Sequence, residues 1–131
     1  MERKELTRTF TKGLKQIKSL RRFRNREGRC YELAFLAIER EPQSLRLTLI
    51  HGYLMQPNGP KVGHGWIQIE DGRVYEPVAG RYFPSMDEFS AVTGAVVEHR
   101  YSRDEAIQEN EKSRWSPIRL RSDLPVGLLR R

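Results

Sequence analysis

The sequence predicts an α+β fold in which a small antiparallel sheet packs against a central helix that carries the only cysteine. Two observations lead to this fold class. Residues 28–39 have apolar side chains at helical spacing, and residues 63–78 contain two strand-like runs around an Asp-Gly pair. A chain of 131 residues has the length of one domain, so we expect a single core with terminal extensions.

Positive charge is concentrated near the N-terminus. Residues 1–29 contain eleven of the 24 Lys and Arg residues and three acidic residues, whereas the rest of the chain is close to neutral. Apolar residues in this segment recur every three or four positions: Leu6, Phe10, Leu14, Ile17 and Leu20. This spacing predicts that residues 1–27 form a basic, amphipathic helical arm.

Such an arm has two interpretations. It contacts the phosphates of a nucleic acid, or an acidic protein, through sequence-independent attraction. Alternatively, its charges form a solvated helix face that keeps a small protein soluble. The basic residues that we expect to meet a nucleic acid are Lys12, Lys15, Lys18, Arg21, Arg22 and Arg24.

The helix predicted over residues 28–39 is expected to be buried. Its apolar residues at positions i, i+3, i+4 and i+7 are Tyr31, Ala34, Phe35 and Ile38, and further apolar residues fill the neighbouring face. Gly28 precedes the segment and Pro42 follows it, which suits a sharp entry and a stop. Cys30 then lies in the first turn, where unpaired backbone N–H groups and the helix dipole favour a thiolate over a thiol.

Strands and further helices follow in order. Alternating, β-branched and aromatic residues predict strands at residues 45–54, 63–70, 73–78 and 95–101. Ser85 and Glu88 form a capping box for a short helix that ends near Gly94, and Ser102 caps a last polar helix that runs to about Lys112. We therefore assign residues 28–116 to the α+β domain and residues 117–131 to an irregular basic tail.

Three residues in chain order have the chemistry of a catalytic triad. Cys30 opens the buried helix, His64 lies at the start of one strand, and Glu76 lies on the next strand. A cysteine nucleophile needs a base that takes its proton, and the base needs a third group that fixes its tautomer and orientation. His51, on the preceding strand, is the rival base. Each residue also has a plainer interpretation as a core, turn or strand-end residue.

The turn between the two strands decides whether this triad can form. With a two-residue turn at Asp71-Gly72, His64 and Glu76 lie on opposite faces of the sheet. With a three-residue loop over residues 70–72 and Gly72 in a left-handed bulge position, His64, Trp66 and Glu76 share one face. The triad requires the second turn.

These motifs resemble a known family. A Cys-Tyr-Glu run at a helix start, Gly63-His64-Gly65-Trp66 and Val74-Tyr75-Glu76-Pro77 are similar to the Cys, His and Asp/Glu/Asn pattern of the papain-like superfamily. The likeness is nearest to its transglutaminase-like and bacterial cell-wall endopeptidase branches, and to small uncharacterised phage and bacterial proteins. It covers roughly residues 28–80. Glu76 departs from the more common Asp or Asn.

The resemblance implies a papain-like core and a small cysteine hydrolase or acyltransferase that acts on an amide or ester bond. It implies Cys30 as nucleophile, His64 as general base and Glu76 as orienting carboxylate. Asn25 is the nearest upstream amide for an oxyanion hole, and Trp66 and Tyr75 are expected in the core or at the site rim. The alternative function is a non-catalytic papain-like scaffold that binds nucleic acid or a protein through the basic arm.

Other classes of function lack sequence support. The chain shows no metal-ligand spacing, phosphate-binding glycine loop or dinucleotide fingerprint, so we expect no cofactor and no metal. No apolar run approaches the length of a membrane span, and the N-terminus lacks the apolar region of a secretory signal. A single cysteine also fits a reducing compartment, so we expect a cytoplasmic protein.

Overall fold

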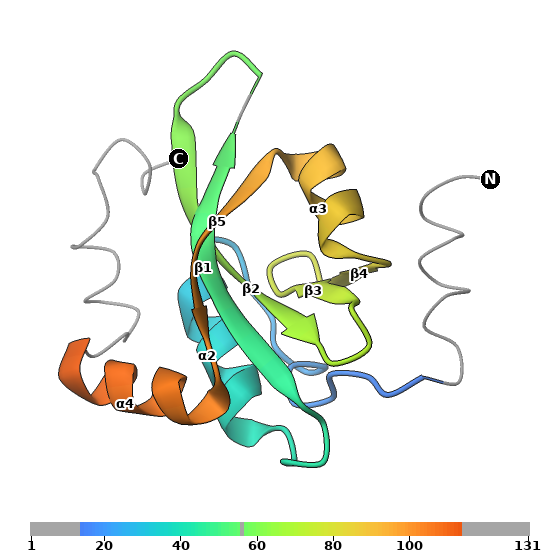
Figure 1. The fold of residues 1–131 in the computed structure, drawn as a ribbon, viewed down its shortest axis with the longest axis vertical. Coiled ribbons are helices and arrows are strands. Elements are labelled where there is room, and N and C mark those ends of the chain that lie inside the picture. Colours follow the sequence, from blue (N-terminus) through green and yellow to red (C-terminus); the bar gives the residue numbers. More distant parts are fainter. Residues whose placement is uncertain (1–13, 56, 114–131) are drawn as a thin grey trace.

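Figure 1 shows the computed structural model, which describes residues 14–55 and 57–113. The described chain is an α+β fold with one five-stranded antiparallel sheet in the order β4-β3-β2-β1-β5. The strands are β1 (Leu47–Met55), β2 (Lys61–Ile69), β3 (Val74–Glu76), β4 (Arg81–Phe83) and β5 (Ala95–Tyr101). The helices in the described residues are α2 (Cys30–Arg40), α3 (Met86–Thr93) and α4 (Arg103–Ser113).

Different helices cover the two faces of the sheet (Figure 1). Helices α2 and α4 pack on one face and share a core with strands β1 and β2. The other face packs on α3 through an aromatic cluster in which Trp66, Phe83 and Phe89 are almost completely buried. Because apolar side chains leave both faces of the central strands, these strands separate two cores.

Helix α2 begins at the cysteine, as the sequence predicted. Six of its eleven residues are buried, which agrees with the apolar spacing of the segment. The helix ends where the N–H of Glu41 bonds to the carbonyl of Ala37 and the chain turns to an extended conformation before Pro42. The unpaired N–H groups of the first turn therefore surround the position of Cys30.

Strands β2 and β3 are joined by a three-residue loop over residues 70–72. The paired residues are Ile67 with Tyr75 and Gln68 with Val74. Gly72 has a φ of 98°, in the region that favours glycine. This register confirms the second of the two predicted turns, and strand alternation puts His64, Trp66 and Glu76 on the same face of the sheet.

The predicted N-terminal helix is absent from the described part of the arm, where the chain follows bends and turns. Its backbone groups bond to distant side chains instead of to helical partners. The carboxylate of Glu41 accepts the N–H groups of Lys18 and Ser19 at 2.9 and 2.6 Å. The hydroxyl of Tyr82 accepts the N–H of Ile17 at 2.7 Å. These contacts hold the segment in an irregular, non-helical path.

The arm is nevertheless packed on the domain. Ile17 and Leu20 are buried in the core that α2 and α4 form. Buried Arg73 connects the arm to the sheet, because its guanidinium donates to the carbonyl of Lys15. The same guanidinium forms an ion pair with Asp71 at 2.9 Å. The apolar residues that predicted a helix stripe thus serve as anchors of an irregular segment. Residues 1–13, with Lys12, and the predicted tail at 117–131 lie outside the described residues.

Several local predictions are confirmed. Ser85 accepts the N–H of Glu88 at 3.1 Å at the start of α3, and Gly94 ends that helix with a φ of 72°. Ser102 and Glu105 bond reciprocally at the start of α4. Strand β4 was not predicted, since its three residues are too short for a period-two pattern. Among the described residues, none of the helices has the length and apolar character that crossing a bilayer requires.

The contact between Glu41 and the arm gives a prediction about stability. Replacing Glu41 with Ala removes the acceptor of two backbone N–H groups, and we expect the free energy of unfolding to fall by about 1–3 kcal/mol. Urea denaturation measures this change. The matched control is Glu39→Ala, which removes an exposed carboxylate from the last turn of α2, two residues before Glu41, and should change the stability by less than about 0.5 kcal/mol. Equal effects of the two substitutions would contradict this account of the arm.

Candidate active site

The structure brings His64 and Glu76 into direct contact. Nε2 of His64 lies 2.8 Å from Oε2 of Glu76, and both side chains are buried, with about a tenth of their surface exposed. They meet because β2 and β3 have the register described above. Since Nε2 is bonded to the carboxylate, Nδ1 is the ring nitrogen that remains for a second partner.

The chain after β3 wraps around the carboxylate of Glu76. The N–H of Val78 donates to Oε2 at 3.0 Å, and the N–H of Ala79 donates to Oε1 at 2.7 Å. The N–H of Gly80 closes the turn on the carbonyl of Glu76 at 2.9 Å. Both carboxylate oxygens therefore have partners, and the side chain is held in one orientation toward the imidazole.

Cys30 lies near His64, at the start of α2. The thiol group is buried, and its charge and proximity raise the pKa of the imidazole. Gly65, next to His64, allows the start of α2 to come this close to β2. A Cβ atom at Gly65 would lie 3.2 Å from Cδ1 of Tyr31 and 3.5 Å from its Cα. The missing side chain thus makes room for the first turn of the helix.

The charges of the site shift the pKa of both partners. Burial lowers the pKa of His64, but the charge and hydrogen bond of Cys30 and those of Glu76 outweigh burial and raise the pKa to about 10. For Glu76, burial raises the pKa, whereas the hydrogen bond and charge of His64 and the two loop N–H groups bring it below its ordinary value. Both shifts favour an ion pair between an imidazolium and a carboxylate.

His51, the rival base, lies elsewhere. It pairs with Gly65 across β1 and β2, so its side chain leaves the face opposite to that of His64. Its ring contacts the rings of Tyr31 and Tyr101, at centroid distances of 4.8 and 5.3 Å. Burial, with a smaller contribution from the charge of His99, lowers the pKa of His51 to about 4. The structure does not bring His51 together with Glu76.

The other residues named from the sequence have different locations. Trp66 is completely buried and stacks on His64, with ring centroids 6.0 Å apart. It supports the imidazole from the core and does not form a rim. Tyr75 is also a core residue, on the face opposite to Glu76. Asn25 is exposed and has a φ of 55°, a conformation that Asn tolerates better than most residues.

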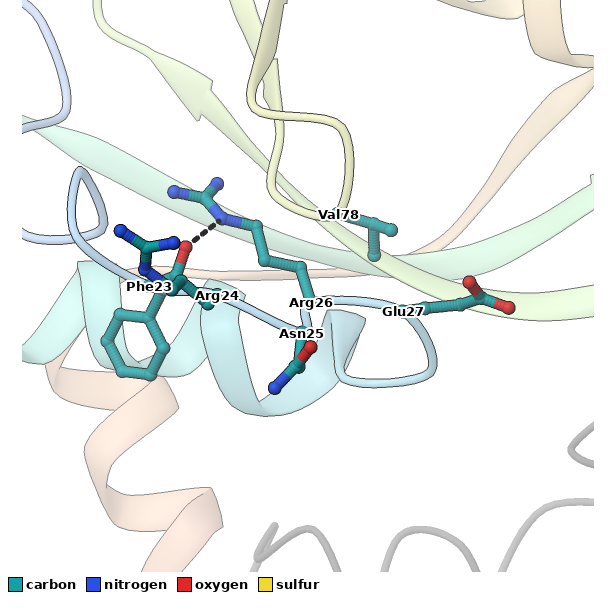
Figure 2. A pocket seen from close by; sticks show the side chains of 6 residues that line it. All are labelled: Phe23, Arg24, Asn25, Arg26, Glu27 and Val78. Carbon is teal, nitrogen blue, oxygen red and sulfur yellow. Dashed lines mark hydrogen bonds between the residues drawn. The ribbon is translucent and has the colours of Figure 1, made fainter.

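Asn25 lines a pocket of about 530 Å³, which is shown in Figure 2. One wall is the segment from Phe23 to Glu27, which leads into Cys30, and the other is Val78, from the loop that holds Glu76. Arg24, which the sequence suggested as a nucleic-acid contact, also lines this pocket. The pocket therefore lies between the segment that precedes α2 and the loop that follows β3.

Arg26 is a residue of the site that the sequence did not reveal. Its guanidinium donates to the carbonyl of Pro77 at 2.9 Å and to the hydroxyl of Tyr75 at 3.1 Å. It also donates to the carbonyls of Phe23, marked by the dashed line in Figure 2, and Leu20. Arg26 thus ties the segment before the cysteine to the loop after Glu76. In the sequence it is one of many arginines in a basic run, and nothing distinguishes it there.

Comparison of the chain with protein-family models, curated proteins and solved structures finds no match. Within residues 14–55 and 57–113, no group of three His, Cys, Asp or Glu side chains is arranged to hold a metal ion.

The pKa shift of His64 gives a prediction about titration. In NMR spectra the His64 ring should titrate well above pH 6.5, and Glu76→Gln should lower its midpoint because the carboxylate charge is removed. The stabilisation from the raised pKa is complete below the unfolded value of about 6.5 and is lost as the pH rises through the folded pKa. The internal control is His51, which should stay neutral above pH 5 in both proteins. An unchanged His64 midpoint in Glu76→Gln would contradict the coupling.

Proposed function

We propose that this protein is a cysteine-dependent hydrolase or acyltransferase with a papain-like arrangement, in which α2 is the central helix and Cys30 the nucleophile. One observation carries the proposal. A buried imidazole is bonded through Nε2 to a fixed carboxylate, and a buried thiol at a helix start contributes to the raised pKa of that imidazole. This is the relation of nucleophile, base and orienting group that covalent catalysis requires.

In the proposed reaction, Nδ1 of His64 first takes the thiol proton of Cys30. The sulfur then attacks the carbonyl carbon of an amide or ester. The carbonyl oxygen becomes an oxyanion, which the N–H of Cys30 can stabilise because it has no partner within the helix. When the carbon–nitrogen or carbon–oxygen bond breaks, His64 gives its proton to the leaving amine or alcohol. Water or an amine then releases the acyl group from the sulfur, and the thiol is restored.

Glu76 has the positioning role in this mechanism. Its carboxylate accepts a hydrogen bond from the Nε2–H group of His64. This bond fixes the ring tautomer and leaves Nδ1 available for the thiol proton. The carboxylate also stabilises the imidazolium that forms in each proton transfer. Because the site is nearly closed to water, these charges interact more strongly than they would at the surface.

The reactivity of the thiol tests the proposal. At pH 6 an ordinary thiol is largely protonated and reacts slowly with iodoacetamide, whereas a thiolate paired with an imidazolium reacts rapidly. We expect Cys30 to be alkylated at least about tenfold faster than glutathione at this pH, and His64→Asn to remove that advantage. Mass spectrometry of the labelled protein measures both rates, and Cys30→Ser shows that the label is on the cysteine.

Two outcomes of this experiment decide against the triad. If Cys30 reacts at the rate of glutathione, it is not an activated nucleophile. If His51→Gln lowers the rate as much as His64→Asn does, the base is not the residue that Glu76 holds. Thermal denaturation of each variant separates a loss of reactivity from a loss of folding.

A second candidate is nucleic-acid binding by the basic arm, on a scaffold without catalysis. The observation in its favour is that Lys18, Arg21, Arg22 and Arg24 are exposed. Lys15 is exposed too, but it bonds to the carbonyl of Ser44 and lies 3.7 Å from Glu70. Of these residues, Arg24 also lines the pocket described above, whereas Arg21 and Arg22 do not, so substitution of Arg21 and Arg22 tests nucleic-acid binding separately.

Binding to double-stranded DNA at increasing salt tests this candidate. If Arg21 and Arg22 contact phosphates, the double substitution Arg21→Gln with Arg22→Gln should weaken binding and reduce the slope of log K against log salt by about two. Substitution is preferable to deletion of the arm, because Ile17 and Leu20 belong to the core. Arg46→Gln is the control for an exposed charge elsewhere. No binding at low salt would exclude this function.

A further inference from the structure

The pocket lined by residues 23–27 and Val78 carries positive charge that the described carboxylates do not neutralise. All the hydrogen-bond partners of Arg26 given above are uncharged: three carbonyls, of which one is that of Pro77, and the hydroxyl of Tyr75. Arg24 is exposed, and within residues 14–55 and 57–113 it forms no ion pair. Glu27 also lines the pocket, but its side chain points away from both arginines (Figure 2).

The pocket is placed where part of a substrate would lie. The carbonyl of Arg26 accepts the N–H of Arg29 at 3.0 Å, which closes the turn directly before Cys30. On the opposite wall, the backbone of Val78 is bonded to the carboxylate of Glu76. One wall is thus linked by a single turn to Cys30, and the other by a single hydrogen bond to Glu76.

The two arginines differ in what they can offer a ligand. The guanidinium of Arg26 already donates to its four partners, so it contributes charge rather than free N–H groups. The guanidinium of Arg24 is exposed, and it has the fork geometry that suits a carboxylate. A neutral ligand gains no attraction between opposite charges in this pocket, whereas a carboxylate placed here is attracted by both arginines.

We propose that this pocket selects an acyl donor that carries a negative charge close to the scissile carbonyl, and that Arg24 is the specificity-determining residue. The proposal rests on the proposed function, because it concerns the substrate of the same cysteine. The class of substrate is an amide or ester with a carboxylate a few bonds from the reacting carbon. The charge binds in the pocket and the carbonyl is presented to Cys30.

A pair of matched alkylating reagents tests this preference. N-chloroacetyl-β-alanine carries a carboxylate, and N-chloroacetyl-β-alanine amide has nearly the same shape without the charge. The measured quantity is the ratio of their second-order rate constants at Cys30, obtained by mass spectrometry of the full chain. We expect Arg24→Gln to lower the ratio of charged to neutral reagent about two- to fivefold, the range that partly exposed charge pairs provide.

Two controls separate a local contact from the general charge of the protein. Arg46→Gln removes one exposed positive charge away from the pocket and should leave the ratio where it was. Raising the NaCl concentration from about 0.02 to about 0.5 M should lower the ratio in the unsubstituted protein more than in Arg24→Gln, because salt screens an exposed charge. Loss of folding cannot mimic this result, since it would affect both reagents.

The outcomes distinguish this proposal from the proposed function. A ratio that Arg24→Gln does not change, or that Arg46→Gln lowers equally, overturns the anion preference alone. If the neutral reagent labels Cys30 no faster than it labels glutathione, and His64→Asn has no effect, the proposed function fails. Absence of labelling by either reagent overturns both.

Discussion

The carboxylate of Glu76 is the group on which the candidate site depends. It is buried, and a charge in that position is tolerated only because His64 and the N–H groups of Val78 and Ala79 surround it. Removing water from such a group is costly, and the cost is offset by contacts from β2 and from the loop after β3. The same contacts hold the imidazole, so one interaction both stabilises the hairpin and orients the His64 ring.

The N-terminal segment belongs to the site as well as to the core. Ile17 and Leu20 anchor it to the face that α2 covers, and Arg26 connects it to the loop after β3. The position of Cys30 is therefore determined from two sides: the packing of α2 on the sheet, and the bonded segment that leads into the helix. The charge pattern predicted an arm separate from the domain. In the structure, residues 23–27 of this arm instead form one wall of the pocket.

Much of the fold could be predicted because its signals are local. The helix that begins at Cys30, the caps at Ser85 and Ser102, and the strands on both sides of Gly72 follow from spacing and turn chemistry over a few residues. The sequence left two turns open, and only the pairing of the strands decided between them. The order of Cys30, His64 and Glu76 suggested a triad, but the turn determines whether they can meet.

The remaining features depend on contacts between distant parts of the chain. Ile17 and Leu20 have helical spacing, yet the carboxylate of Glu41 and the hydroxyl of Tyr82 bond to the backbone around them. Competition of this kind is not visible in a window of neighbouring residues. Arg26 was missed for the same reason: its partners come from two distant segments, and its neighbours in sequence are also arginines.

The loop that holds Glu76 has a consequence for when the thiol acquires its partners. Cys30 is synthesised before the imidazole, the carboxylate and the N–H groups of Val78 and Ala79, which follow later in the chain. Only when β3 has paired with β2 does the chain hold the imidazole and the carboxylate in contact. The reactivity that we propose for Cys30 therefore requires the tertiary structure and is absent from an unfolded chain.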